Sequence, residues 1–229
     1  MKRLWLRARA PFAAFRPLQA GVYRTTARTF PPSAAYGLLL NLAGIESRSS
    51  GSQVTTSTRE GLPKLRLAIG NVHEPSVGTL YQQLHGYLVG NSGKEFKRRS
   101  HGSKYWIAPV RREVLIGLDC VMGFETDELH LVERVEMGLQ GRLPERRYGL
   151  PFAGDNNFLF DRLDLLVQPP PTFWLQHLAL DSGPRVGSAR LTVSINRLDS
   201  SRTQTALMAP VDMPTIEPPE SAWVWTPSQ

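Results

Sequence analysis

The sequence has very little cysteine and no long apolar run. Cys120 is the only cysteine among 229 residues, which excludes a disulfide within the chain and a cysteine-based zinc cluster. No stretch is long and apolar enough to span a bilayer, and the basic N-terminus lacks the continuous apolar segment of a signal peptide. We therefore expect a cytoplasmic protein without membrane contact, metal or other cofactor.

Catalytic motifs are also missing. The chain has no phosphate-binding Walker loop, no HExxH zinc motif and no nucleophile elbow. Its five histidines are scattered, without the spacing of metal ligands, and four of them are interpreted as structural. His101, close to Lys104, is the one histidine that suggests acid–base chemistry on RNA, and a simple phosphate contact is the alternative that we favour.

Acidic residues are scarce in the first half of the chain. Residues 1–112 contain 18 basic and 4 acidic residues, a formal charge of +14, whereas residues 113–229 contain 9 and 16, a charge of −7. All five lysines lie at or before Lys104. This asymmetry favours a first half that faces a polyanion and an acidic second half that faces solvent or a partner. Ordinary solubilising charge is the alternative, and we favour nucleic acid.

Two patterns near the N-terminus predict a strand and a helix. Residues 3–10 alternate strictly, with leucine and alanine on one face and Arg3, Trp5, Arg7 and Arg9 on the other. The stretch from Ser33 to Ile45 carries no charge, which indicates a buried helix. Ser33, after a double proline, is the expected N-cap, and Gly44 the expected end of the helix.

Later patterns complete an α+β fold. Strands are predicted in 64–70, in 112–122 with Ile116 on the buried face, and in 158–167. Thr126 is expected to cap a helix that buries a stripe beginning at Leu129. The order strand, helix, strand, strand, helix, strand is typical of a ferredoxin-like (RRM-type) βαββαβ domain. We assign it to residues 1–168, with an inserted β-hairpin at about 71–110. Residues 169–229 form a small C-terminal extension that contains a strand and packs on the domain, with Trp223 and Trp225 packed.

Several basic segments are candidate RNA-binding sites. The Arg–Trp–Arg–Arg face of the first strand offers cations for phosphates and an aromatic ring for a base. This interpretation expects that no acidic side chain neutralises the three arginines. The next loop adds Tyr23 and further arginines, and residues 147–158 could bring backbone amides to phosphate. Segment 94–106 interleaves cations with aromatic residues, as nucleic-acid fingers do. The RNA-binding candidates are Arg7, Arg9, Arg16, Arg24, Arg28, Ser33, Tyr36, Lys94, Lys97, Arg98, Arg99, His101, Lys104, Trp106, Gly154 and Asn156. For each segment, a solvated surface is the competing interpretation.

The segments "RAPFAAFRP" and "FPPSAAYGLLLNLAGIE" resemble the Cas-five family of CRISPR-associated proteins. This family belongs to the RAMP superfamily and supplies subunits of type I Cascade effectors. The resemblance is strongest to the Dev-type branch of type I-B-like systems. "VRREVLIGLD" and "GLPFAGDNNF" fall where the family has similar segments. The resemblance implies a modified RRM fold with a thumb-like hairpin, which here would be the 71–110 insertion.

The resemblance also implies a role and partners. The subunit would cap one end of the crRNA and grip its 5′ handle. It would sit between the first Cas-seven backbone subunit and the large subunit of the Cas-eight type, with target DNA near the PAM as a further candidate partner. The complex would recognise DNA in antiviral defence or in transposon targeting. The type I-C equivalent cuts precursor crRNA with a Tyr, Lys and His constellation. Tyr36, Lys104 and His101 are conceivable counterparts here, but the adjacent Lys–His pair is missing.

Three hypotheses follow. The chain is a non-catalytic RNA-binding assembly subunit, which we favour, or a metal-independent endoribonuclease of the same fold. Without the resemblance, it is a free-standing RRM-type protein.

Overall fold

The computed structural model describes residues 2–17, 23–49, 57–88, 105–179, 181–183 and 185–227. Its helices are α1 (Pro32–Leu42) and α2 (Leu129–Leu139), with short 3-10 turns η2 (Ser200–Arg202) and η3 (Glu220–Ala222). Its strands are β1 (Lys2–Ala13), β2 (Tyr23–Arg24), β3 (Leu65–Asn71), β4 (Ser76–Leu88), β5 (Tyr105–Thr126), β6 (Arg162–Leu166), β7 (Phe173–His177), β8 (Ala189–Ser194), β9 (Gln204–Pro210) and β10 (Val224–Thr226). No helix in these ranges is long and apolar enough to cross a membrane.

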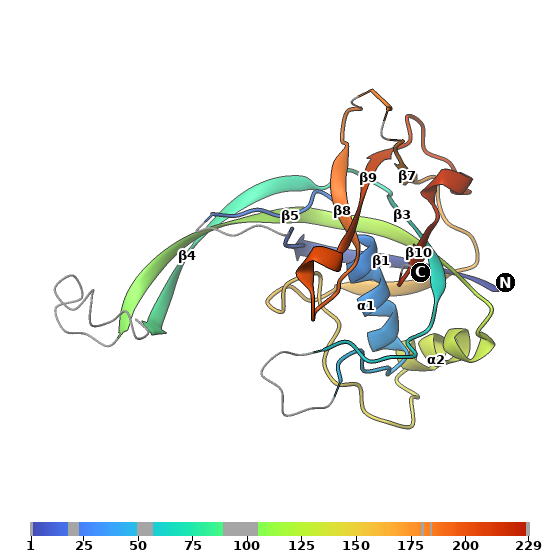
Figure 1. The fold of residues 1–229 in the computed structure, drawn as a ribbon, viewed down its shortest axis with the longest axis horizontal. Coiled ribbons are helices and arrows are strands. Elements are labelled where there is room, and N and C mark those ends of the chain that lie inside the picture. Colours follow the sequence, from blue (N-terminus) through green and yellow to red (C-terminus); the bar gives the residue numbers. More distant parts are fainter. Residues whose placement is uncertain are drawn as a thin grey trace.

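One mostly antiparallel sheet organises the molecule (Figure 1). Its strands follow the order β6-β1-β5-β3-β7-β9-β8, and the pairs β6–β1, β1–β5 and β5–β3 are all antiparallel. Helices α1 and α2 contribute to the core that covers the leucine face of β1. The α+β class is confirmed, and this strand order is compatible with a ferredoxin-like fold.

The alternation predicted for β1 is confirmed, whereas the start of α1 differs from the prediction. Leu4, Leu6, Ala8 and Ala10 are buried. The helix begins at Pro32, and Pro31 rather than Ser33 is its N-cap, with no side-chain cap. Proline suits the first helical position because its missing N–H would have no partner there. The predicted end is confirmed: Gly44 has a φ of 70°, and the Ile45 N–H donates to the Leu40 carbonyl at 2.8 Å.

The buried stripe of α2 is shifted from the predicted one. Leu131, Val135 and Gly138 are buried, but Leu129 is half exposed. The Thr126 hydroxyl accepts the Glu128 N–H at 3.1 Å just before the helix begins, so Thr126 is not the N-cap itself.

A long hairpin arm projects from the sheet at the expected position (Figure 1). It is formed by β4 and the first part of β5, which then runs without interruption into the centre of the sheet. Near the bend, Gly117 has a φ of 72°. Ile116 was predicted in the core but is 43% exposed, because the regular alternation breaks where the strand leaves the sheet.

The C-terminal extension continues the same sheet. Strand β7 pairs with the end of β3, and β10 pairs with its beginning. Strand β10 also lies against β8, where the Thr226 hydroxyl donates to the Val193 carbonyl at 3.3 Å. The sequence predicted only β8 of these strands. Of the two tail tryptophans expected to pack, Trp223 does so, but Trp225 is 41% exposed.

Candidate nucleic-acid interface

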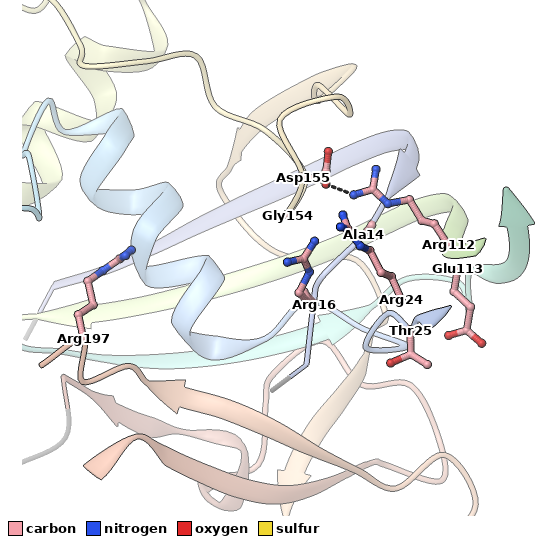
Figure 2. A pocket seen from close by; sticks show the side chains of 9 residues that line it. All are labelled: Ala14, Arg16, Arg24, Thr25, Arg112, Glu113, Gly154, Asp155 and Arg197. Carbon is pink, nitrogen blue, oxygen red and sulfur yellow. Dashed lines mark hydrogen bonds and ion pairs between the residues drawn. The ribbon is translucent and has the colours of Figure 1, made fainter. Parts of the chain in front are cut away.

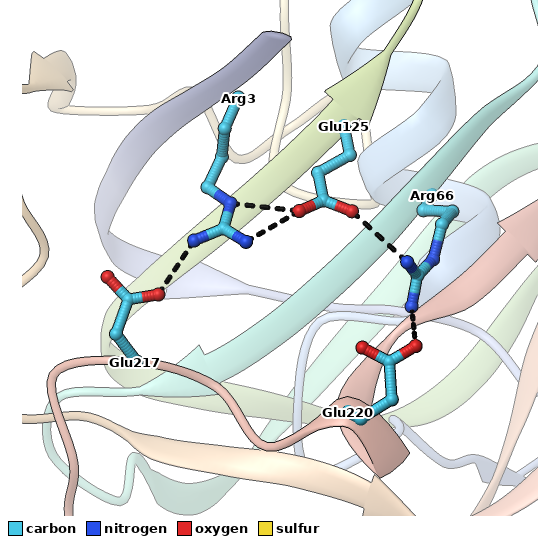
Figure 3. Close-up of polar contacts among 5 residues, drawn as sticks. All are labelled: Arg3, Arg66, Glu125, Glu217 and Glu220. Carbon is cyan, nitrogen blue, oxygen red and sulfur yellow. Dashed lines mark hydrogen bonds and ion pairs between the residues drawn. The ribbon is translucent and has the colours of Figure 1, made fainter. Parts of the chain in front are cut away.

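The arginine face of β1 is neutralised by acids from distant segments. Arg3 donates to Glu125 at 2.6 and 2.9 Å and to Glu217 at 2.7 Å. Arg66 bonds the other oxygen of Glu125 at 3.3 Å and also contacts Glu220. Figure 3 shows the resulting chain of five alternating charges, with Glu125 at its centre. The strand register explains this arrangement of charges, because Arg3 on β1 and Arg66 on β3 both lie opposite Glu125 on β5.

Arg7 and Arg9 are paired in the same way. The Arg7 guanidinium makes two hydrogen bonds to Asp119, at 2.6 and 2.8 Å, and Arg9 bonds Asp164 at 2.9 Å. The Asp119 carboxylate raises the pKa of Arg7 further, mainly through this hydrogen bonding. The expectation that this face lacks acid partners is wrong, since the acids stand opposite or diagonal to the arginines on β5 and β6.

The tryptophan of this face is covered. Trp5 is 6% exposed and packs against Trp174 and Trp223, with ring centroids 5.7 and 6.2 Å away. Arg3 lies over the rings of both Trp5 and Trp223. The expectation that Trp5 is open to a base is therefore also wrong, because the C-terminal extension occupies that position.

A cleft of about 500 Å³ lies instead at the root of the arm (Figure 2). We call it the arginine cleft. Its walls come from the end of β1 and the loop after it, from β2, from β5, and from the loops before β6 and after β8. The lining residues are Ala14, Arg16, Arg24, Thr25, Arg112, Glu113, Gly154, Asp155 and Arg197.

Charge in the arginine cleft is only partly compensated. Arg112 is buried and paired with Asp155, whose other oxygen accepts the Asn157 N–H at 3.0 Å. Arg16 is exposed and Arg24 half-buried, and neither has an ion-pair partner within the described ranges. Four arginines against two carboxylates leave the lining with a formal charge of +2. In Figure 2 the Arg16 and Arg24 guanidinium groups extend toward the same side as that of Arg112.

Gly154 shapes one wall of the cleft. Its φ is 81°, and a Cβ at this position would overlap the carbonyl oxygen of Ala14. The close approach is held by the Ala14 N–H, which donates to the Ala153 carbonyl at 3.0 Å. Glycine is needed here for both backbone conformation and space.

The sequence thus identified Arg16, Arg24 and Gly154, which the fold brings together. It missed Arg112, Thr25, Asp155 and Arg197 as members of the same site. A double arginine within an alternating strand, Arg111–Arg112, was the one local signal available, because such a pair must place a cation on each face. Nothing local pointed to Arg197.

The remaining candidates lie elsewhere. Arg28 and Asn156 are exposed, and Ser33 is half-buried within the first turn of α1. The Tyr36 hydroxyl donates to the Pro63 carbonyl at 2.8 Å, and burial raises its pKa, with a smaller contribution from Glu128. Trp106 lies in β5 opposite Tyr87. Lys94, Lys97, Arg98, Arg99, His101 and Lys104 lie outside the described residues. The part of the chain that is described holds no His, Cys, Asp and Glu cluster able to bind a metal ion.

No family model and no curated protein matches the chain. Solved structures with the same fold include two that cover nearly the whole chain. One, described as a CRISPR RNA-guided surveillance complex, is 12% identical with a TM-score of 0.59, over 93% of this chain and 90% of that one. The other, described as a Cas protein, is also 12% identical, with a TM-score of 0.52 over 93% of this chain and 95% of that one. At this identity the likeness shows a common fold.

Proposed function

We propose that this protein is a non-catalytic RNA-binding subunit of a CRISPR surveillance complex, and that it holds the 5′ handle of the crRNA in the arginine cleft. The observation that carries the proposal is the pair Arg16 and Arg24, two arginines that lie in a cleft at the root of the arm and have no ion-pair partner among the described residues. Unpaired guanidinium groups in a concave site bind phosphate well, since their fork of donors matches its oxygens.

The buried Arg112–Asp155 pair fits a supporting role. A buried guanidinium with a carboxylate partner keeps the local charge near zero and fixes the wall of the cleft. Arg16 and Arg24 then supply the attraction for RNA. The closed sheet face argues for the same site, because the surface that RRM domains offer to RNA is covered here by Trp174 and Trp223.

The fold and the resemblance support a wider assignment, which we also propose. We propose that β1, α1, β3, β5, α2 and β6 form an RRM-type βαββαβ unit of the RAMP kind, with the β4–β5 arm as its thumb. The chain would be a Cas-five subunit of the type I-B-like branch, acting in the cytoplasm. Its partners would be the Cas-seven backbone subunit, the Cas-eight-type large subunit, and target DNA near the PAM. The likeness to a chain of a surveillance complex over nearly its whole length supports this assembly role.

The chain is proposed to be non-catalytic because the described lining of the cleft offers no histidine, and Tyr36 uses its hydroxyl in a backbone hydrogen bond. Cleavage without a metal needs a base at the 2′-hydroxyl and an acid at the leaving oxygen. Repeat RNA incubated with the purified subunit in EDTA should therefore stay intact. Specific cutting that His101→Ala abolishes would establish the endoribonuclease instead.

Binding of labelled repeat RNA to the double variant Arg16→Ala/Arg24→Ala tests the handle-binding proposal. The variant should bind much more weakly, and the slope of log affinity against log salt should fall by about 1.4, because two phosphate contacts on a single strand are lost. The control is Arg142→Ala/Arg146→Ala, which removes the same charge from two exposed residues outside the cleft. Equal affinity and slope for the two folded variants would refute the proposal.

A further inference from the structure

Three side chains form a row across the root of the arm. Tyr23 on β2 lies opposite Arg111 on β5, and Arg111 lies opposite Tyr81 on β4. Residues directly opposite each other on neighbouring strands share a face of the sheet. The row is therefore an arginine between two tyrosines, all on one face.

This row is exposed and held in place at one end. Tyr23 is 46% exposed and Tyr81 is 61% exposed, and Arg111 is exposed as well. The Tyr23 hydroxyl donates to Glu113 Oε1 at 3.1 Å, which fixes the ring relative to β5. Arg111 has no ion pair or ring contact within the ranges that are described. Exposed aromatic side chains that lie together mark interaction sites, whereas single exposed hydrophobic side chains are common.

The spacing of the row suits a single strand of nucleic acid. Neighbouring strands lie about 4.8 Å apart, so the two tyrosines stand roughly 10 Å apart with the guanidinium between them. Such a separation accommodates two successive unpaired bases, one on each ring, and the phosphate that joins them. Base–aromatic stacking and an arginine–phosphate contact are the two interactions that hold single strands.

The row also continues the arginine cleft. Arg24 and Arg112 follow Tyr23 and Arg111 directly in their strands and line the cleft. Successive residues of a strand point to opposite faces, so Arg24 and Arg112 point away from the row, whereas Glu113, which also lines the cleft, shares the face of Arg111. The cleft therefore reaches the row around the edge formed by the short strand β2. An RNA strand that leaves the cleft can pass over this edge to the row.

We propose that Tyr23, Arg111 and Tyr81 form a two-nucleotide stacking site for single-stranded RNA. This site rests on the proposed RNA-binding function, and it adds the recognition of unpaired bases to the binding of phosphates in the cleft. A protein surface could also cover two tyrosines, but the unpaired arginine and the continuity with the cleft favour RNA.

Binding of a short single-stranded RNA to Tyr81→Ala tests the stacking site, in parallel with an oligomer of the same backbone that carries abasic positions. Tyr81→Ala should weaken binding of the normal RNA by about five-fold or more, because one base stack is lost. The salt slope should stay as in the parent, since no phosphate contact is removed. Affinity for the abasic oligomer should be the same for both proteins. Tyr81→Phe, which keeps the ring, and Val77→Ala, on the same face of β4, should bind as the parent does.

Two results would overturn the stacking site. One is unchanged binding of normal RNA to Tyr81→Ala. The other is an equal loss with the abasic oligomer, which would show that the ring contacts no base. If Tyr81→Ala binds RNA normally but no longer co-purifies with other subunits, the row is a protein contact.

The stacking site and the cleft can be refuted separately. Loss of RNA binding in Arg16→Ala/Arg24→Ala would still support RNA binding in the cleft, whatever the result for Tyr81→Ala. A single-stranded DNA of the same sequence shows whether the site prefers RNA.

Discussion

At the scale of single residues, the molecule uses arginine in two opposite ways. Arg3, Arg7 and Arg66 are held by carboxylates at short distances and stabilise the sheet. Arg16, Arg24 and Arg111 have no such partners among the described residues and are exposed or half-buried. Whether an arginine has an acidic partner therefore separates structural arginines from candidate ligand-binding arginines. Its position on a basic strand is a poorer guide.

Glu125 is the residue on which the structural arginines depend most. It is 8% exposed and bonds both Arg3 and Arg66. Glu125→Ala should lower the free energy of unfolding by about 2–4 kcal/mol, because it leaves two partly buried guanidinium groups without their shared partner. Urea unfolding measures this loss. The control Glu217→Ala removes an exposed acid of the same network and should cost less than about 1 kcal/mol. Equal losses in the two variants would contradict the central position of Glu125.

At the scale of elements, the two helices meet at a glycine. A Cβ at Gly138 of α2 would overlap the carbonyl oxygen of Leu42 at the end of α1. Gly37, also inside a helix, has nothing within 4 Å of its Cβ position. The first glycine is thus required by packing, while the second is only a weak helix former.

Substitution of these glycines by alanine should have opposite effects on stability. Gly138→Ala should destabilise by about 1–3 kcal/mol, because a backbone oxygen cannot move away without separating the helices. Gly37→Ala should stabilise by up to about 1 kcal/mol through helix propensity alone. Denaturant unfolding of both variants is the measurement. Destabilisation by Gly37→Ala, or a neutral Gly138→Ala, would show that the helix contact is described incorrectly.

Local patterns were sufficient for some elements and not for others. The alternation of β1 and the uncharged run of α1 are properties of neighbouring residues, so the strand, the helix and its end at Gly44 could be predicted. The partners of Arg7 and Arg9 lie 112 and 155 residues away, and only the strand register reveals them. Arg16 and Arg24 could be identified from the basic loop after β1, but the absence of acids before Glu46 applies equally to the paired arginines of β1. Arg112 and Arg197 could not be identified, because loops distant in the chain complete the cleft.

At the scale of the whole molecule, the C-terminal extension limits which surfaces of the sheet stay open. It extends the sheet through β7, β9 and β8, and its tryptophans cover the face opposite the helices. With that face closed, Arg16, Arg24 and Arg111, which have no ion-pair partner among the described residues, lie together at the root of the projecting arm. We infer that RNA runs along the cleft and the arm, and does not cross the sheet.

Mapping the contacts of bound RNA on the protein tests this central claim most directly. The RNA would carry a photoreactive uridine, and the cross-linked peptides would be identified by mass spectrometry. Cross-links are expected at Tyr23, at Arg111 to Glu113 and around Gly154. None is expected at Trp5, Trp174 or Trp223, which are packed against one another. Cross-links to these tryptophans, with none at the arm root, would show that RNA binds the sheet face and would contradict the account.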